Sequence, residues 1–255
     1  MPSISEYSRE FSWQLKTRLN YSPTLQRKPG IKSLETLLRG FNPTQQGRFN
    51  QLSGRYALHD WPRLCGTSEY IENLYVLDLL DQYLTLSKPH DPGLDIGCRN
   101  FSHLPALNAF TQYPWHGVEL DGHARYWNGY TRRAYGEWIA RQYPDCRYIA
   151  DSLLNIKGSY SVIYWALPFV TPQPLVRWGL PTRFFQPSAL LQKAWELLAN
   201  NGVMLIINQG HHEAEVQQTL FSHIGIEARS TGALSSIFSP FKKTRIGWII
   251  EKPEP

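Results

Sequence analysis

Three acidic residues stand at the ends of short apolar runs, where their side chains could hold a nucleoside. Asp95 lies within "GLDIG", Glu119 within "HGVEL", and Asp151 directly follows "CRYIA". Glu119 comes 22 positions after Gly97, and a carboxylate there can accept hydrogen bonds from both ribose hydroxyls. An acid at the next strand end could accept from the exocyclic amine of adenine. Each acid alone could simply cap a turn or face water, so the prediction depends on all three together.

These acids need a sheet that brings the strand ends to one edge. Short apolar runs predict strands at residues 93–97, 116–120, 146–150, 160–166, 203–209, 226–230 and 245–251. Helical patterns follow the first five, notably over 122–142 and 187–200. This alternation predicts a parallel sheet whose ligand crevice lies beyond the carboxyl ends of the strands. The last two runs are joined by "TGALSSIFSPFKKT", which has no helical pattern and favours a closing antiparallel hairpin.

Residues 1–88 are predicted to form a helical region and residues 89–255 the domain that carries the sheet. An amphipathic helix at the N-terminus is predicted from apolar residues at helical spacing, namely Ile4, Tyr7, Phe11, Leu15 and Leu19. A second helix starts near Thr67 and ends before residue 88. This region could cover a bound cofactor as a lid through Tyr70 or Asn73.

The composition restricts the cellular compartment and the classes of partner that we expect. The 255 residues include three widely separated cysteines, which give neither a disulfide framework nor a metal-ligand spacing. We therefore expect a cytoplasmic, soluble protein with no metal site and no membrane partner. The net charge is +5, and residues 1–63 hold 10 Lys/Arg against 4 Asp/Glu. This surplus could face nucleic acid, but the cations are scattered singly and a solvated helical surface explains them at least as well.

From about Gly93 to Glu251 the sequence resembles the class I S-adenosylmethionine-dependent methyltransferases. Five segments occur in the family's order: "LDIGC", "GVELD", "IADSLL", "SVIYWALPF" and "RIGWIIE". The resemblance implies a seven-stranded, doubly wound, mostly parallel Rossmann-like sheet that ends in an antiparallel hairpin. It also implies methyltransferase activity with S-adenosylmethionine as the cofactor.

The resemblance assigns roles to individual residues. It places Asp95 near the methionyl amino group, Gly97 against the cofactor, Glu119 on the ribose and Asp151 on the adenine amine. Further residues expected at the cofactor are Cys98, Arg99, Asn100, Leu120, Ser152, Trp165 and Ala166.

The first motif departs from the family, which usually has glycine at the positions of Arg99 and Phe101. A positive φ at a non-glycine residue costs about 1 kcal/mol, which does not exclude binding. Arg99 could pair with the methionyl carboxylate, or both side chains could fill the pocket of a fold that has lost its ligand. Retained binding is favoured because Glu119 and Asp151 are still present. A nicotinamide dinucleotide is disfavoured because "GCRNFS" is a poor pyrophosphate loop.

Methyl transfer from a sulfonium mainly requires alignment of the reactants, so no protein nucleophile is expected. His211, which follows the fifth strand, and His103 are weak candidates for a base. The segment after the fourth strand has Ala166-Leu167-Pro168-Phe169 in place of the Asn/Asp-Pro-Pro typical of methyltransferases acting on base amines, so methylation of a base amine is disfavoured.

A proline-rich, aromatic stretch, "VTPQPLVRWGLPTRFFQP", follows and is predicted to be a loop over the crevice. A pocket for a small, partly apolar or aromatic acceptor is predicted from Phe169, Trp178, Phe184 and Phe185. These side chains could instead pack the loop onto the N-terminal helices. The alternatives to a small-molecule methyltransferase are a non-catalytic binding or scaffold protein of this fold and, less favoured, an RNA methyltransferase.

Overall fold

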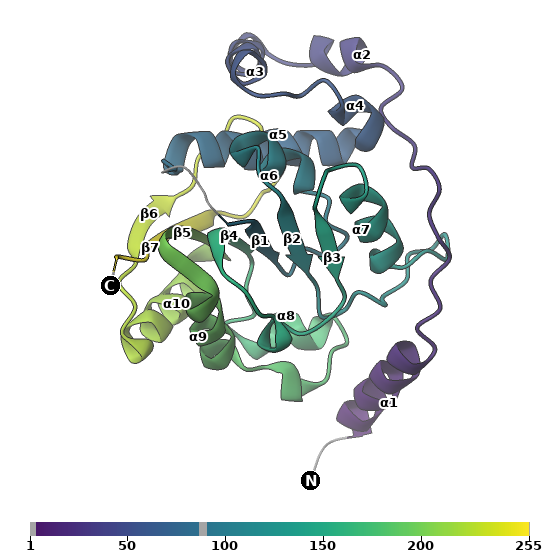
Figure 1. Cartoon of the computed structure of the whole chain (residues 1–255), viewed down its shortest axis with the longest axis vertical. Helices are drawn as coiled ribbons and strands as arrows, with labels where there is room; N and C mark the ends of the chain where they lie inside the picture. Colours follow the sequence, from purple (N-terminus) through teal and green to yellow (C-terminus); the bar gives the residue numbers. More distant parts are fainter. Residues whose placement is uncertain (1–3, 87–90, 255) are drawn as a thin grey trace.

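The computed structural model describes residues 4–86 and 91–254, which form one mixed sheet covered by helices on both faces (Figure 1). The strand order across the sheet is β3-β2-β1-β4-β5-β7-β6. The strands are β1 (Gly93–Ile96), β2 (Trp115–Val118), β3 (Arg147–Ile149), β4 (Tyr160–Ala166), β5 (Leu198–Gln209), β6 (Arg229–Ala233) and β7 (Arg245–Glu251).

Strand direction follows the sequence prediction. Strands β1 to β5 pair in parallel, β7 runs antiparallel to β5, and β6 pairs antiparallel with β7. The chain reverses between β1 and β4, so the carboxyl ends of these two neighbouring strands form the switch point at which open α/β sheets bind ligands. The doubly wound Rossmann-like sheet with a closing hairpin is confirmed.

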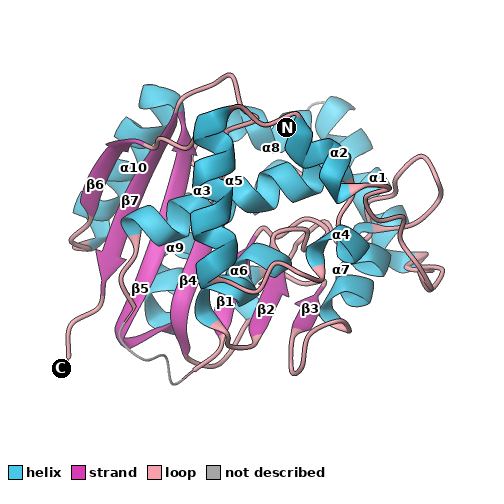
Figure 2. Ribbon diagram, turned by 90° about the horizontal axis from the view of Figure 1, so that it is seen from above, coloured by secondary structure: helices cyan, strands magenta, loops and turns pink. Residues whose placement is uncertain are grey.

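Helices lie on both faces of the sheet (Figures 1 and 2), and each face carries a hydrophobic core. One face is covered by α5 (Thr67–Tyr83), α6 (Leu104–Thr111) and α7 (Arg132–Ala140), and the other by α9 (Pro187–Leu197) and α10 (Gly210–Ile224). Side chains alternate along β1, so Leu94 and Ile96 enter the core beneath α9 while Asp95 points to the α5 face. This alternation determines which of the predicted residues can face the α9 side of the sheet.

The N-terminal region contains more helix than the sequence prediction gave it. Besides α1 (Ile4–Arg18) and α5, it forms α2 (Leu34–Arg39), α3 (Pro43–Arg55) and α4 (Trp61–Leu64). Helix α3 begins with a capping box, because Asn42 Oδ1 accepts from the Gln45 amide at 2.9 Å and Gln45 Oε1 accepts from the Asn42 amide at 3.1 Å. The sequence "NPTQ" carries this signal, which the prediction missed. The predicted division at residue 88 lies outside the described residues.

The predicted helix over 122–142 is wrong in its first half. Helix α7 spans only Arg132–Ala140, because Thr131 caps it by accepting from the Ala134 amide at 3.0 Å. Residues 122–131 form a loop, in which Arg125 and Thr131 pair as an isolated antiparallel bridge.

Four smaller predictions also need correction. The interval after β3 holds only a 3-10 turn, η1 (Leu153–Asn155), and the helix predicted over 187–200 stops at Leu197 because β5 begins at Leu198. The predicted loop after β4 contains α8 (Pro172–Arg177) and a 3-10 turn, η2 (Thr182–Phe184). Strand β6 starts three residues late, since Ile226 packs under the end of α10 after Gly225 turns the chain with a φ of 70°.

Candidate functional site

A cavity of about 350 Å³ opens at the carboxyl ends of β1, β2, β4 and β5, on the side of the sheet that faces α8 and α9. Its volume lies within the range of about 300–1,000 Å³ that is usual for small-ligand pockets. Eight of the residues predicted to bind the cofactor line it, namely Gly97, Arg99, Glu119, Leu120, Asp151, Ser152, Trp165 and Ala166. The convergence of Glu119 and Asp151 from neighbouring strands on one cavity is the arrangement that the sequence predicted.

The loop after β1 keeps a glycine-type backbone although two of its residues are not glycine. Gly97, Arg99 and Phe101 have φ values of 69°, 53° and 58°, all in the left-handed region. Hydrogen bonds hold this conformation: the Arg99 amide donates to Glu119 Oε2 at 2.9 Å, and the Tyr148 hydroxyl donates to the Arg99 carbonyl at 2.7 Å. The departure from the family's residue types therefore changes the side chains and leaves the course of the loop intact.

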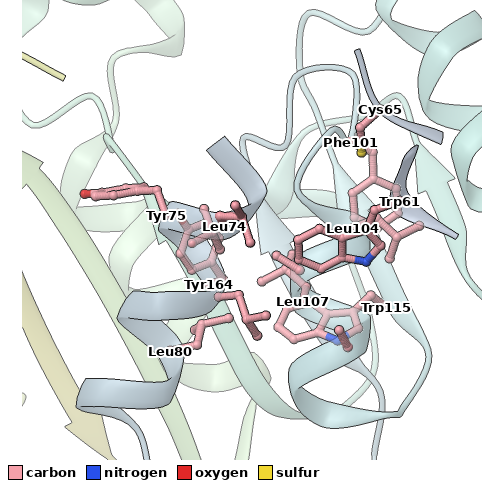
Figure 3. Close-up of a cluster of buried hydrophobic side chains, with 14 of the residues drawn as sticks. Trp61, Cys65, Leu74, Tyr75, Leu80, Phe101, Leu104, Leu107, Trp115 and Tyr164 are labelled. Atoms are coloured by element: carbon pink, nitrogen blue, oxygen red, sulfur yellow. The ribbon is translucent and has the colours of Figure 1, made fainter. Parts of the chain in front are cut away.

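The Phe101 ring lies away from the cavity. It is fully buried in the core between the sheet and α5–α6, together with Leu104, Leu107 and Trp115 (Figure 3). Gly117 in β2 provides the space, because a Cβ there would lie 2.8 Å from the Phe101 ring. Hence, of the two unexpected residues in the loop, only Arg99 lines the cavity, and its charge also acts, after a larger effect of His103, to lower the pKa of Glu72 in α5.

Glu119 is a buried carboxylate with a defined set of donors. Its Oε1 accepts from the Asp121 amide at 2.7 Å and lies 3.3 Å from the Arg132 guanidinium, while its Oε2 accepts from Arg99. Burial raises the pKa of Glu119 above its ordinary value, and Arg132 and the two amides act in the opposite direction. Each carboxylate oxygen has two lone pairs, so Oε2 retains one that can accept from a ligand, whereas Oε1 accepts from a ligand only if its long contact with Arg132 opens.

Asp151 is more exposed, and its local contacts use one oxygen. Its Oδ1 accepts from the Ser152 amide at 2.7 Å and from Asn155 Nδ2 at 2.8 Å. The prediction allowed that Asp151 might only cap the segment after it, and this bond to Ser152 has that character. Asp151 also lines the cavity, so its capping contact does not exclude the predicted contact with a ligand.

Three residues predicted at the cofactor, Asp95, Cys98 and Asn100, do not line this cavity. Asp95 is 2% exposed on the α5 face, and its Oδ2 has no hydrogen-bond partner among the described residues. Burial first, and the Glu119 carboxylate second, raise the pKa of Asp95 well above its ordinary value. Burial likewise raises the pKa of the Cys98 thiol. The pleat of β1 turns Asp95 inward, while Cys98 and Asn100 lie in the loop after the strand, and a motif read along the chain does not show which face a side chain takes.

The side of the cavity where the sequence predicts an acceptor pocket is formed by α8, η2 and the segments that flank them. Phe169 and Trp178 meet edge to face at 6.2 Å, and the Arg132 guanidinium lies 4.5 Å from the centre of the Trp178 ring. Phe184 also lines the cavity and packs at 4.7 Å against Trp13 of α1. The remaining predicted residue, Phe185, packs in this aromatic cluster without lining the cavity. The stretch therefore packs on an N-terminal helix, as the second alternative predicted, and also lines the cavity, while the acceptor pocket stays a prediction.

Neither histidine proposed as a base lines the cavity. His103 lies on the α5 side, 3.7 Å from Glu72, and His211 is exposed at the start of α10. Tyr70 and Asn73 are also absent from the lining; Asn73 instead accepts from the Ala106 amide at 3.0 Å and so holds α6.

The cavity also includes Arg177, Gln209 and Glu213, which sequence reasoning missed. Glu213 accepts from the Gln209 amide at 2.9 Å at the beginning of α10. A Gln-Gly pair followed by an acid at the end of a predicted strand was the available signal.

The N-terminal cations mostly have partners. Ion pairs join Arg9 to Glu6, Lys16 to Asp121, Lys28 to Glu69 and Arg39 to Glu35. Arg48 pairs with Asp78 and Asp81, and Arg55 also pairs with Asp81. The local surplus of charge that motivated the RNA alternative is therefore largely matched by acids in the folded chain.

Comparison with solved structures agrees with this architecture. A proposed S-adenosyl-L-methionine-dependent methyltransferase of Methanococcus maripaludis matches with a TM-score of 0.52 at 11% identity, over 82% of this chain and 94% of that protein. The chain has the class I methyltransferase fold. Identity this low establishes the fold, and activity has to be argued from the site.

Two further similar structures were solved with cofactor or product. The magnesium protoporphyrin IX methyltransferase of Synechocystis PCC 6803, with bound SAM, matches at a TM-score of 0.47 and 13% identity, over 86% of this chain and 96% of that one. The plantazolicin methyltransferase BpumL, in complex with SAH, matches at 0.45 and 12% identity, over 98% and 100%. No family model and no curated protein matches the chain.

Proposed function

We propose that this protein is an S-adenosylmethionine-dependent methyltransferase that acts on a small, partly apolar or aromatic acceptor. The observation that carries the proposal is the convergence of Glu119, Asp151 and Gly97 on one cavity at the switch point of the sheet. Carboxylates suit the neutral hydroxyl and amine donors of adenosine and would repel a phosphate.

The residues present fit the cofactor. Glu119 would accept from the ribose hydroxyls, Asp151 from the adenine amine, and Arg99 would pair with the methionyl carboxylate. At Gly97 nothing lies within 4 Å of an added Cβ, so the backbone there is open to close approach. When bound, the cofactor supplies an electrophilic methyl group on a sulfonium.

The chain's own part in the reaction is to bind, orient and exclude water. Phe169, Trp178 and Phe184 would hold a planar acceptor against the cofactor, with Trp178 fixed in place by Arg132. Alignment alone accounts for several kcal/mol of a displacement barrier. The non-catalytic alternative supposes that the side chains of Arg99 and Phe101 fill the pocket. Phe101 is buried in the core instead, so only Arg99 still supports that alternative.

Calorimetry tests the cofactor site. S-adenosylhomocysteine should bind the wild type, and Asp151→Ala should weaken it by about 1–3 kcal/mol, because a hydrogen bond to a charged group is lost. Asp151 is exposed and its contacts are local, so this variant should fold. S-inosylhomocysteine, which has a carbonyl oxygen in place of the adenine amine, serves as the control ligand. Because this oxygen and the Asp151 carboxylate are both acceptors, Asp151→Ala should not weaken its binding and should strengthen it.

Two outcomes would contradict the proposal. One is binding of NAD in preference to S-adenosylhomocysteine. The other is a wild type that binds neither ligand, which would favour the scaffold alternative.

A further inference from the structure

Helix α1 packs on the molecule with its polar side inward. Trp13 is its buried residue, and a half-buried polar ring surrounds it, formed by Glu6, Arg9, Glu10, Lys16 and Thr17. The apolar residues that predicted this helix lie on the opposite side and are exposed: Ile4 by 89%, Tyr7 by 63%, Phe11 by 68% and Leu15 by 48%. Their spacing places them on one stripe of the helix. The predicted amphipathic helix is therefore present, and its apolar stripe faces away from the protein.

Specific contacts fix this inverted orientation. Glu6 Oε1 accepts from the Thr182 amide at 2.7 Å, and Glu10 pairs with Arg183 at 2.9 Å. Near the other end, Lys16 pairs with the buried Asp121. Exposed ion pairs stabilise less than burial of a large apolar side chain, so these contacts alone do not explain an outward apolar stripe. A partner outside the chain would explain it.

Further exposed apolar side chains lie beyond the end of the helix. Leu19 and Tyr21 are 63% and 71% exposed, and Trp127 is fully exposed. Arg125 donates to the Tyr21 carbonyl at 2.6 Å, which ties the loop of residues 122–131 to the segment that follows α1. Figure 1 shows α1 and this segment along one edge of the molecule. We define the outer stripe as Ile4, Tyr7, Phe11, Leu15, Leu19, Tyr21 and Trp127.

The one charged side chain that α1 places on this side is a cation. Both acids of α1, Glu6 and Glu10, face inward. Arg18 projects on the same side as Phe11 by helical periodicity, is exposed, and forms no ion pair within the described ranges. Apolar side chains with interfacial Tyr and Trp, a nearby cation and no acid are the features of helices that lie in the headgroup region of anionic membranes.

A second copy of the chain fits this surface less well. A stable protein interface takes about 20–30 residues from each side, and the outer stripe is a single narrow row. None of the helices formed by residues 4–86 and 91–254 combines the length and apolar character that crossing a bilayer requires. We infer that α1 docks the protein on the surface of an anionic lipid bilayer through the outer stripe.

The same helix reaches the cavity. Trp13, on the inward side of α1, packs at 4.7 Å against Phe184 of the cavity wall. If the proposed function holds, this wall lies about one helix thickness, roughly 10 Å, from the lipid, which suits an acceptor dissolved in the bilayer.

Vesicle co-sedimentation of the full chain tests the inference. The wild type should bind vesicles of equal parts phosphatidylcholine and phosphatidylglycerol, and bind pure phosphatidylcholine more weakly. Phe11→Glu should lower the affinity for the mixed vesicles about tenfold or more, because an apolar anchor is replaced by a charge. Arg18→Gln should lower it about fivefold and leave binding to phosphatidylcholine unchanged.

Ile237→Glu is the matched control. Ile237 is 40% exposed near α3, where Gln45 bonds its carbonyl, and its replacement should leave vesicle binding unchanged. All variants should keep the wild-type affinity for S-adenosylhomocysteine, which shows that they fold.

Three results would overturn the inference: a wild type that binds no vesicles, a Phe11→Glu variant that binds as the wild type does, or a wild-type dimer in sedimentation equilibrium that Phe11→Glu dissociates. Vesicle binding by a protein that does not bind S-adenosylhomocysteine would support the inference while contradicting the proposed function.

Discussion

At the scale of single residues, Arg99 and Phe101 show that a loop can keep a glycine-type conformation without glycine. The left-handed conformation costs each about 1 kcal/mol, and burial of the Phe101 ring together with the bonds to Glu119 and Tyr148 outweighs this cost. Gly117 makes the arrangement possible because its missing side chain leaves space for the ring. A departure from a motif at one position is thus compensated at another position in a neighbouring strand.

Arg99 can be tested with two variants that share the loss of the guanidinium. Arg99→Gly also removes the left-handed strain and should unfold in urea with a free energy about 1 kcal/mol above that of Arg99→Ala. Both should weaken S-adenosylhomocysteine in calorimetry by a similar factor. Neither should weaken 5′-methylthioadenosine, which lacks the methionyl carboxylate. Tighter binding of S-adenosylhomocysteine by both variants would show that the arginine obstructs the site.

At the scale of elements, α7 supports the loop after β1 through its packing on β3. A Cβ on Gly136 of α7 would lie 2.1 Å from the ring of Tyr148 in β3. The hydroxyl of that tyrosine donates to the Arg99 carbonyl, so the closeness of helix and strand sets the position of the loop. Glycine is required here for close approach.

Gly136→Ala should therefore destabilise the protein by about 1–3 kcal/mol in urea unfolding, since the Tyr148 ring must move. It should also weaken S-adenosylhomocysteine, because the loop loses a hydrogen bond. The control is Gly47→Ala in α3, where nothing lies within 4 Å of the added Cβ. That variant should gain about 0.5–1 kcal/mol from helix propensity. Equal effects at the two glycines would show that the contact with Tyr148 does not matter.

At the scale of the whole molecule, the stability of the fold depends on a buried acid. The folded chain raises the pKa of Asp95 well above its ordinary value. Below the ordinary pKa, Asp95 is protonated in both the folded and the unfolded state, so its ionisation does not change the free energy of unfolding. As pH rises, the unfolded chain releases this proton while the folded chain retains it, so the free energy of unfolding falls until the folded pKa is reached.

Asp95→Asn should remove this dependence. Urea unfolding at pH 5 and pH 8 measures this. The free energy of unfolding of the variant minus that of the wild type should be larger at pH 8 than at pH 5, because only the wild type loses stability as pH rises. Any cost of the amide at this position is independent of pH and cancels in the comparison. A difference between the two proteins that stays constant from pH 4 to pH 8 would mean that Asp95 ionises normally in the folded chain.

Much of the site was predictable because its signals are local. Glu119 and Asp151 follow apolar runs that end at turns, and strands of a parallel sheet end at the same edge. Arg177 was not predictable, because it comes from α8, whose packing over the sheet is a tertiary property, and Glu213 had only the local signal of an acid shortly after the end of a strand. His103 failed as a candidate for the same reason, since α6 carries it to the other face.

The sequence by itself determined the order of strands along the chain, the closing hairpin and the acids at the strand ends, since periodicity and turn residues act over a few positions. Only the tertiary structure decided which face each side chain takes. Asp95 and Ile96 are neighbours in one motif, yet the pleat sends them to opposite cores. Helix α1 gives the same result on a larger scale. Its apolar stripe is visible in the sequence, but the side of the helix that faces the protein is set by the ion pairs that hold the helix in place.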